Sequence, residues 1–366
     1  MQSVTSTLML KMVALFSIGL LLSMGSMAQA EKISTSVKKE TFVYAWKDTN
    51  ELALDIYRSD SLSPAEKRPC VIFAFGGAFV GGHRDDTLYN RYFNELAEHH
   101  YVVASVSYRL GLRGVQHLSK FDIAPLNNAI NMAVEDVYDA TAWLLNRADD
   151  LGIDTSKIIL SGSSSGAITV LESDYKRRNQ LVVKTSLSPD FNYAGVIAFS
   201  GAILSVDWGI KYQKNPAPTM FFHGTADHIV PYNKIGFLNK GLFGSNALAK
   251  VFKKKGYPFF FYSEENLGHE VSVLPMIYDI PEILDFIQQY VVEKKPYQIS
   301  LNFNDRDAKP MLTMTAEELL KKLQYERTPA IPINKTSRIR KLEQVDIPKI
   351  DSGYLALYSS SHPISQ

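Results

Sequence analysis

The sequence is poor in cysteine, with Cys70 the single cysteine in 366 residues. One thiol excludes an intrachain disulfide and a zinc site built on cysteines. Cys70 begins the apolar run CVIFAF (70–75), and this position favours a small buried side chain.

The sequence also has no marked excess of positive or negative charge. Lysine and arginine number 39 and aspartate and glutamate 38, so the formal net charge is +1. This balance excludes a chain-wide electrostatic grip on nucleic acid, and no block of five or six like charges indicates a polybasic membrane arm. With 46% hydrophobic residues the chain can bury a large core. Function therefore has to come from local groups of residues, and we expect no nucleic-acid partner.

Residues 1–30 have the pattern of a secretory signal peptide. Lys11 precedes the apolar run 12–24, and an Ala-Gln-Ala sequence ends at Ala30, after which we predict cleavage. The run is shorter than the roughly 20 residues of a membrane-spanning helix, so we expect no stable membrane insertion after cleavage. An uncleaved N-terminal anchor is the alternative. An exported chain with one cysteine cannot rely on disulfides, which indicates a bacterial periplasmic or secreted location.

Eight short runs with the composition of strands alternate with longer helical patterns. They are residues 41–46, 52–57, 70–75, 102–108, 157–162, 195–201, 219–224 and 258–263. The first two alternate apolar with polar residues, as half-exposed antiparallel strands do. Most of the later runs are continuously apolar, as buried parallel strands are. We predict an α/β fold of about eight strands, mostly parallel, with an antiparallel N-terminal edge and helices on both faces.

The regular alternation of strand and helix patterns ends after the last long helical pattern, at 280–294. We therefore predict a main domain over 31–296 and treat 297–366 as a C-terminal extension of unknown role. Within the extension, Thr315 and Glu318 form the capping box of one short predicted helix.

The sequence GSSSG at 162–166 lies between an apolar strand and a helix-capable stretch. In that context G-x-S-x-G is typical of a turn so tight that its serine, Ser164, projects above the sheet at a helix N-terminus. Gly162 and Gly166 then leave room for the strand and the helix to approach. A Gly/Ser-rich loop without chemistry is the alternative, but the strand–turn–helix context favours a nucleophile.

A serine is a poor nucleophile near pH 7 unless a base lies beside it. His269 follows the run 258–263, and Asp227 follows the run 219–224, so both belong to the sheet edge where function lies in such folds. The order Ser164, Asp227, His269 is that of a hydrolase triad in which the acid orients the histidine. His223 ends a strand and is expected to support the turn.

Small residues after the run 70–75 predict an oxyanion hole. We assign it the backbone N–H groups of Gly77 and Ala78, together with that of Ser165. The glycine pair by itself is equally compatible with packing. Its position alongside an ordered triad favours a functional role.

Over residues from about 40 to 295, the chain resembles the α/β-hydrolase superfamily, in particular bacterial carboxylesterases of the acetyl-xylan, feruloyl and hormone-sensitive-lipase-like kind. The resemblance lies in FGGAF (75–79), SYRLG (107–111), GSSSG (162–166), HGTADHIVP (223–231) and GHE (268–270). It implies that 31–296 is the catalytic domain of a serine esterase that works through an acyl-enzyme and needs no metal or organic cofactor. These esterases often begin the oxyanion motif with His-Gly-Gly-Gly. Phe75 stands in the place of that histidine, so the histidine's role in stiffening the loop is missing.

Only 17 residues, 202–218, separate two of the predicted strands, which leaves little room for a lid. We expect an open cleft for short-acyl esters, either small molecules or acetyl and feruloyl groups carried on carbohydrate, with Phe79 and Trp208 as substrate-binding walls. Three alternatives stay open: a prolyl-oligopeptidase-like serine peptidase, a lactone or formamide hydrolase, and a non-catalytic binding protein of the same fold. Nothing in the sequence predicts the oligomeric state.

Overall fold

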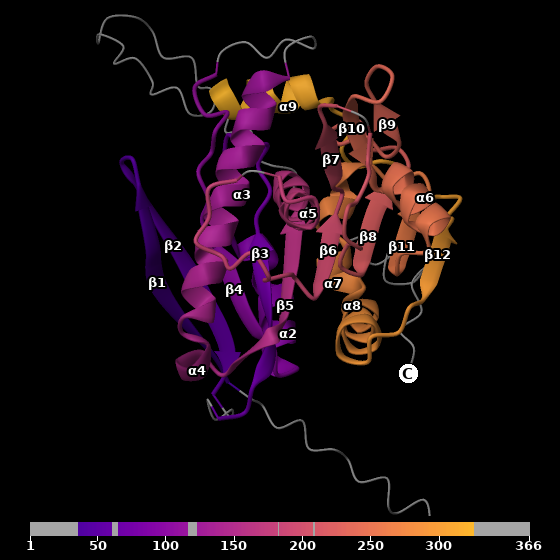
Figure 1. Cartoon of the computed structure of the whole chain (residues 1–366). Coiled ribbons are helices and arrows are strands. Elements are labelled where there is room, and N and C mark those ends of the chain that lie inside the picture. The colour runs from indigo at the N-terminus through magenta and orange to yellow at the C-terminus, as the bar shows by residue number, and fades with distance from the viewer. Residues whose placement is uncertain (1–35, 61–64, 116–122, 182, 208, 326–366) are drawn as a thin grey trace, which may run out of the picture. The chain divides into compact units, whose positions relative to one another are not determined.

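The computed structural model describes residues 36–325, apart from 61–64, 116–122, 182 and 208 (Figure 1). The predicted signal peptide and Trp208 lie outside the described residues, as does the part of the predicted extension beyond residue 325. Within the described ranges, no helix is both long enough and apolar enough to cross a membrane.

A sheet of nine strands carries the fold. From one edge to the other it contains β1 (Val37–Lys47), β2 (Asn50–Ser59), β4 (Val102–Val106), β3 (Arg68–Ala74), β5 (Ile153–Ser163), β6 (Gly195–Phe199), β8 (Thr219–Gly224), β11 (Phe259–Glu264) and β12 (Gln298–Phe303). The pairs β1–β2 and β2–β4 are antiparallel, and all later neighbours are parallel. The predicted strands and the antiparallel N-terminal edge are therefore confirmed.

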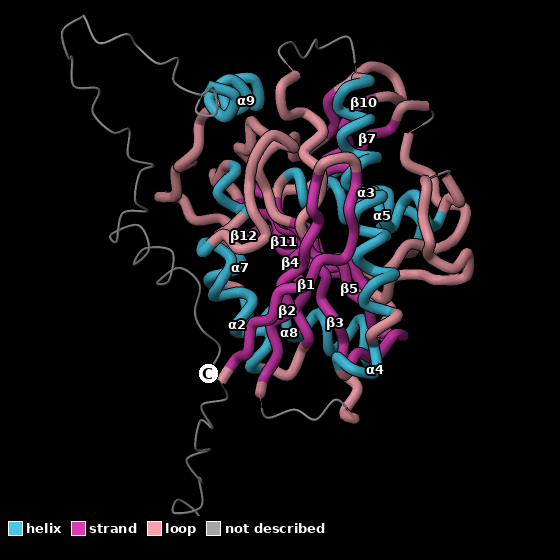
Figure 2. Tube along the Cα trace, turned by 90° about the vertical axis from the view of Figure 1, so that its left-hand side faces the viewer, coloured by secondary structure: helices cyan, strands magenta, loops and turns pink. Residues whose placement is uncertain are grey.

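Helices cover both faces of this sheet, as predicted (Figure 2). On one face lie α2 (Asn90–Glu98), α7 (Pro275–Tyr278) and α8 (Ile280–Phe286), the last continuing as a π-helical turn over Ile287–Val292. On the other face lie α3 (Ala124–Leu145), α4 (Ala148–Leu151) and α5 (Ser165–Arg178), while α6 (Ser245–Lys255) packs on β8 and β11. The chain also forms two short 3₁₀ turns, η1 (Thr87–Tyr89) and η2 (His269–Ser272).

The strand β2 is more deeply buried than its alternating sequence predicts. Every residue from Leu52 to Tyr57 is buried, because α2 covers one face of β2. The polar residue of the pattern, Asp55, is fully buried and accepts a 2.6 Å hydrogen bond from Thr41 Oγ1. Lys39 and Arg84 form ion pairs with the same carboxylate at 3.0 and 3.2 Å. The half-exposed pattern holds for β1 alone, whose outward side chains remain accessible.

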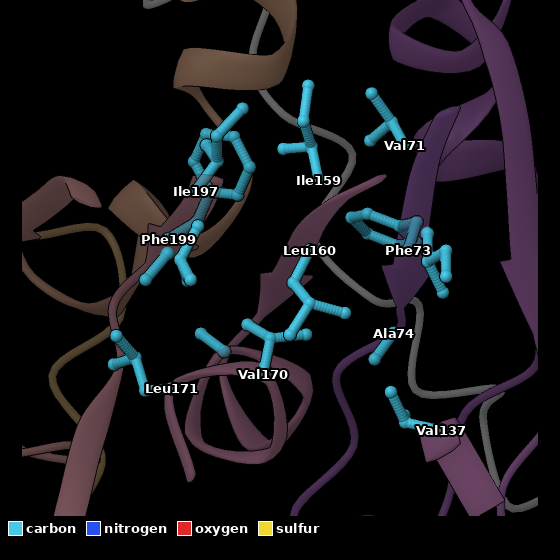
Figure 3. Packing of buried hydrophobic residues seen from close by; sticks show 14 of the residues in the cluster. Val71, Phe73, Ala74, Val137, Ile159, Leu160, Val170, Leu171, Ile197 and Phe199 are labelled. Carbon is cyan, nitrogen blue, oxygen red and sulfur yellow. The ribbon is translucent and has the colours of Figure 1, made fainter. Parts of the chain in front are cut away.

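The core fills both layers between the sheet and its helices. Figure 3 shows Leu160 of β5 beside Val170 of α5, whereas the strand registers put Phe73 of β3 and Phe199 of β6 on the opposite face, where both rings pack against α2. Cys70 belongs to this core, and burial raises the pKa of its thiol to about 12, so it stays protonated. The prediction of a small buried side chain at Cys70 is confirmed.

The sheet gains its ninth strand from the segment that the sequence assigns to the C-terminal extension. β12 pairs in parallel with β11 along six residues. The chain then continues to α9 (Ala316–Tyr325), which begins at the predicted capping box: Glu318 Oε2 accepts from Thr315 N–H at 2.7 Å, and Thr315 Oγ1 accepts from Glu318 N–H at 3.3 Å. A second sheet, β7 (Ala202–Ser205), β10 (Gly241–Gly244) and β9 (Lys234–Ile235), was not expected from the sequence.

Candidate active site

Ser164 occupies the turn between β5 and α5. Its backbone has φ 53° and ψ −117°, a left-handed conformation that costs a non-glycine residue energy. The flanking glycines are required by close contact: a Cβ on Gly162 would lie 2.5 Å from the backbone of Gly166. A Cβ on Gly166 would lie 2.0 Å from the carbonyl oxygen of Ala74. The turn therefore depends on both glycines, and it presents Ser164 at the first turn of α5.

The structure brings Ser164, His269 and Asp227 into one hydrogen-bonded chain. The Ser164 hydroxyl donates to Nε2 of His269 at 2.7 Å, and Nδ1 of His269 donates to Oδ2 of Asp227 at 2.8 Å. His269 begins η2 beyond β11, and Asp227 lies three residues beyond β8. This geometry allows the histidine to accept the serine proton while the carboxylate fixes its tautomer.

Asp227 is buried and fully engaged by hydrogen bonds. Its Oδ1 accepts from the N–H groups of Ile229 and Val230, both at 2.9 Å. Burial by itself would raise the pKa of Asp227, but the bonds from His223 and His269 outweigh it and hold that pKa well below the ordinary value of 3.8. The acid therefore stays ionised wherever a histidine can act as a base.

His223 lies behind Asp227 and is fully buried. Its Nδ1 is 2.8 Å from Ser245 Oγ, and its Nε2 is 3.2 Å from the carbonyl oxygen of Val230 and 3.4 Å from Oδ2 of Asp227. These contacts support the turn that carries the acid, which is the role that its position in the sequence indicates.

The loop after β3 runs beside the nucleophile. A Cβ on Gly76 would lie 3.2 Å from Cβ of Ser164. Gly77, Ala78 and Phe79 all have positive φ (136°, 55° and 57°), so three successive peptides turn in the left-handed region. The carbonyl of Gly77 accepts from the N–H groups of Val80 and Gly81, at 3.0 and 2.9 Å.

The predicted oxyanion donors are free to bind a ligand. Among the residues that the structure describes, no group accepts a hydrogen bond from the N–H of Gly77 or of Ala78. The N–H of Ser165 belongs to the first turn of α5, where helical N–H groups have no partner within the helix. These three donors next to Ser164 remain our candidates for an oxyanion hole.

Two tyrosines hold this loop where related esterases often have a histidine. Tyr108 stacks on Phe75 with ring centroids 4.4 Å apart, and its hydroxyl donates to the Phe75 carbonyl at 2.7 Å and lies 3.3 Å from Ser165 Oγ. The Gly76 N–H donates to the Tyr89 hydroxyl at 3.1 Å. The loop is therefore stiffened despite Phe75. The sequence motifs predict neither role, although SYRLG contains Tyr108.

Of the two residues predicted to form walls of the substrate pocket, the structure describes only Phe79. Phe79 is only 2% exposed and packs edge-on against Tyr108, with ring centroids 6.3 Å apart. This correction follows from burial: Phe79 belongs to the packing behind the loop and offers almost no surface to a substrate. Trp208 lies outside the described residues.

A cavity of about 150 Å³ is lined in part by Phe75 and Tyr108. Its lining includes Arg84 and Arg109, and no residue of the triad. Both guanidinium groups are paired with buried carboxylates, Arg84 with Asp55 and Arg109 with Asp136. The cavity therefore borders an ion-pair network, and no triad residue forms part of its lining.

Comparison with known proteins supports an esterase-like chain. Residues 54–208 match the family BD-FAE, of esterase-like α/β-hydrolases. Lipase 1 of Geotrichum candidum is 28% identical over 163 residues, which are 44% of this chain and 27% of the lipase. The para-nitrobenzyl esterase of Bacillus subtilis is 27% identical over 119 residues, 32% of this chain and 23% of that enzyme. The chain thus matches about a quarter of the length of these relatives.

Solved structures show the same fold. The apo form of Thermogutta terrifontis esterase 2 has a TM-score of 0.51 and 22% sequence identity, covering 73% of this chain and 97% of its own. The tabun-phosphoramylated form of the same esterase has a TM-score of 0.51 at 20% identity, covering 72% of this chain and 97% of its own. At these identities the likeness establishes the α/β-hydrolase fold and leaves the chemistry to the residues of the site.

Proposed function

We propose that this chain, which has the α/β-hydrolase fold, is a serine carboxylic-ester hydrolase acting through Ser164, His269 and Asp227. One observation carries the proposal. The hydroxyl of a serine on a strained strand–helix turn lies 2.7 Å from a histidine that is itself bonded to a buried carboxylate. Nucleophile, base and orienting acid are the parts that acyl transfer requires.

In the proposed reaction, Nε2 of His269 takes the proton of Ser164 as Oγ attacks the ester carbonyl. The negative charge that develops on the carbonyl oxygen is stabilised by the N–H groups of Gly77, Ala78 and Ser165. His269 then gives the proton to the leaving alcohol, and an acyl group stays on Ser164. A water molecule, deprotonated by His269, releases the acid and restores the serine.

We infer that the preferred substrates are short-acyl esters, with acetyl or feruloyl groups on carbohydrate as candidates. Two observations support a small acyl group. Structures of Thermogutta terrifontis esterase 2 contain bound propionate and butyrate. The connection between β6 and β8 is short, and part of it is used by β7, so it has little length for a large lid.

The proposal is tested by hydrolysis of p-nitrophenyl acetate, butyrate and octanoate by residues 31–366 and by a Ser164→Ala variant. We expect turnover that falls from acetate to octanoate and drops by about 10⁴-fold or more in the variant, because alanine cannot form the acyl-enzyme. Ser156→Ala, at the exposed start of β5, serves as the control and should retain full activity.

Two results would contradict the proposal. A folded Ser164→Ala protein with wild-type turnover would exclude the nucleophile. Cleavage of peptide amides by the wild type without ester hydrolysis would favour the peptidase, and inactivity on both substrate classes would favour a binding protein.

We also propose that the chain is exported, with residues 1–30 removed. The order of Lys11, the apolar run 12–24 and the small residues before Ala30 supports this proposal. Acylated polysaccharides outside the cell would then be within reach of the site.

A further inference from the structure

Glu270, the residue after His269, is a buried carboxylate that binds only backbone donors among the described residues. Its Oε1 accepts from the N–H groups of Gly268 and Met311, at 2.8 and 3.0 Å. Its Oε2 accepts from the N–H of Leu312 at 3.3 Å. Gly268 belongs to the histidine loop, whereas Met311 and Leu312 lie beyond β12, so one side chain joins two distant segments of the chain.

The segment that Glu270 holds is residues 304–325, here termed the C-terminal strap. Near its start, the carbonyl of Asp305 accepts from the Asn266 amide at 3.3 Å. Farther on, it packs so closely against the histidine loop that a Cβ on Gly268 would lie 2.9 Å from the carbonyl oxygen of Leu312. The strap therefore runs alongside the loop that carries His269 and is in contact with it.

The other end of the strap reaches the oxyanion side of the site. Gln324 of α9 donates to the carbonyl of Val115 at 2.5 Å. Val115 belongs to the turn that follows SYRLG, and within that turn the N–H of Leu112 donates to the Phe79 carbonyl at 3.0 Å. Figure 1 shows α9 beyond the carboxyl ends of the central strands, the edge that carries the triad. The strap thus connects the histidine loop with the segment that supports the oxyanion loop.

Because the strap is attached beside His269, its position indicates which part of a substrate it would contact. In acyl transfer the histidine gives its proton to the leaving alcohol, so the surroundings of the histidine face the alcohol and not the acyl group. A segment fixed to this loop on one side and to the oxyanion side on the other is placed to limit the size of the alcohol.

We propose that Glu270 is a positioning residue that couples the C-terminal strap to His269, and that the strap forms the alcohol-side wall of the ester site. The proposal rests on the serine esterase function proposed above. Loss of the carboxylate would leave three buried or half-buried N–H groups without their acceptor and free the loop that aims the imidazole.

The test compares Glu270→Ala and Glu270→Gln in residues 31–366, using p-nitrophenyl acetate and trypsin. We expect Glu270→Ala to lower kcat by roughly 10- to 100-fold, because small displacements of a catalytic group are costly. Trypsin should cleave the strap faster at Arg306, Lys321 or Lys322. Glu270→Gln keeps an oxygen that can accept from Gly268 and Met311 and should recover most of the activity.

Two further variants make the test specific. Glu265→Ala removes a neighbouring carboxylate that also contacts the C-terminal part of the chain, through Asn302, and should leave kcat and proteolysis unchanged. Met311→Pro deletes one strap donor and leaves the carboxylate and the histidine loop intact. We expect it to change the ratio of kcat/KM for 1-naphthyl acetate to that for p-nitrophenyl acetate severalfold. The ratio for p-nitrophenyl butyrate to acetate should stay constant.

The proposal is overturned if folded Glu270→Ala retains the kcat and trypsin resistance of the wild type. It is also overturned if Met311→Pro leaves the alcohol ratio unchanged or shifts the acyl ratio equally. Should Glu270→Ala fail to fold, Met311→Pro decides. A wild-type protein without esterase activity would contradict the proposed function, whereas trypsin would still report whether Glu270 anchors the strap.

Discussion

At the scale of single residues, Asp227 has the most demanding environment in the site. It accepts hydrogen bonds from two backbone N–H groups and from His269, and His223 lies against the same carboxylate. Because its folded-state pKa lies below the ordinary 3.8, folding favours the ionised form. The stability that this group contributes is therefore complete above about pH 3.8 and is lost as the pH falls toward the folded-state pKa.

Asp227→Asn should affect both activity and acid stability. An amide cannot hold His269 in the required tautomer, so kcat should fall by about 10³- to 10⁴-fold. The free energy of unfolding, measured with urea, should fall more at pH 7 than at pH 3, because the wild type has already lost part of the contribution at pH 3. Asp149→Asn, at a fully exposed position paired with Lys67, is the control. A loss of stability independent of pH would contradict the prediction.

The roles of individual residues were partly predictable. Ser164, Asp227 and His269 follow from short motifs whose spacing along the chain indicates neighbouring strand ends. Tyr108, Tyr89 and Glu270 were not assigned a role, because each acts on a backbone group of another segment, and those partners are known only once the chain is folded. Phe79 was misassigned because an aromatic residue beside a glycine loop looks the same in sequence whether it packs inward or outward.

At the scale of elements, the turn from β5 to α5 is set by contacts that exclude side chains. Gly166 has no positive φ, so its requirement is one of space: the carbonyl of Ala74, at the end of β3, occupies the position of a Cβ. The oxyanion loop begins directly after β3. The glycine thus links the geometry of the nucleophile to that of the loop beside it.

Gly166→Ala should therefore cost stability and activity together. Overpacking against a backbone carbonyl costs about 1–3 kcal/mol in unfolding free energy, and the displaced end of β3 should lower kcat as well. Gly256→Ala is a suitable comparison, because Gly256 has a φ of 75° at the end of α6 and open space around it. That variant should lose about 1 kcal/mol through backbone strain and keep its activity. Equal effects of the two substitutions on kcat would contradict the prediction.

The strands of the main sheet that have a recognisable apolar pattern within their own sequence were predictable. All eight runs became strands. Seven of them bury a short β-branched or aromatic segment, whereas the first, 41–46, is half exposed and pairs with β2. The ninth strand, β12, escaped prediction because its sequence, QISLNF, is largely exposed and is defined by pairing with β11. The small sheet of β7, β9 and β10 likewise depends on segments that meet only in space.

At the scale of the whole molecule, the N-terminal segment leads to a prediction about location. Expressed with residues 1–366 in a bacterial host, the protein should be recovered from the periplasm or medium with Glu31 as its first residue, which intact mass and N-terminal sequencing can establish. Ala30→Asp should block processing, because the cleavage site requires a small residue there, and Gln29→Asp should not. A full-length chain in the membrane fraction would support an uncleaved anchor, and one in the cytoplasm would contradict export.

The amino-acid sequence alone is sufficient to predict the fold class, the order of the strands along the chain and the three residues of the candidate triad. Each of these depends on patterns within a few residues, such as apolar runs and glycines at a tight turn, whose physical consequences are local. The contacts that hold the site in place are known only from the folded chain: the tyrosine hydroxyls at the oxyanion loop and the link from Glu270 to the C-terminal strap. These contacts join separate segments of the chain, as from Glu270 to Met311, which is 41 residues away, and they depend on register and packing, which no local pattern encodes.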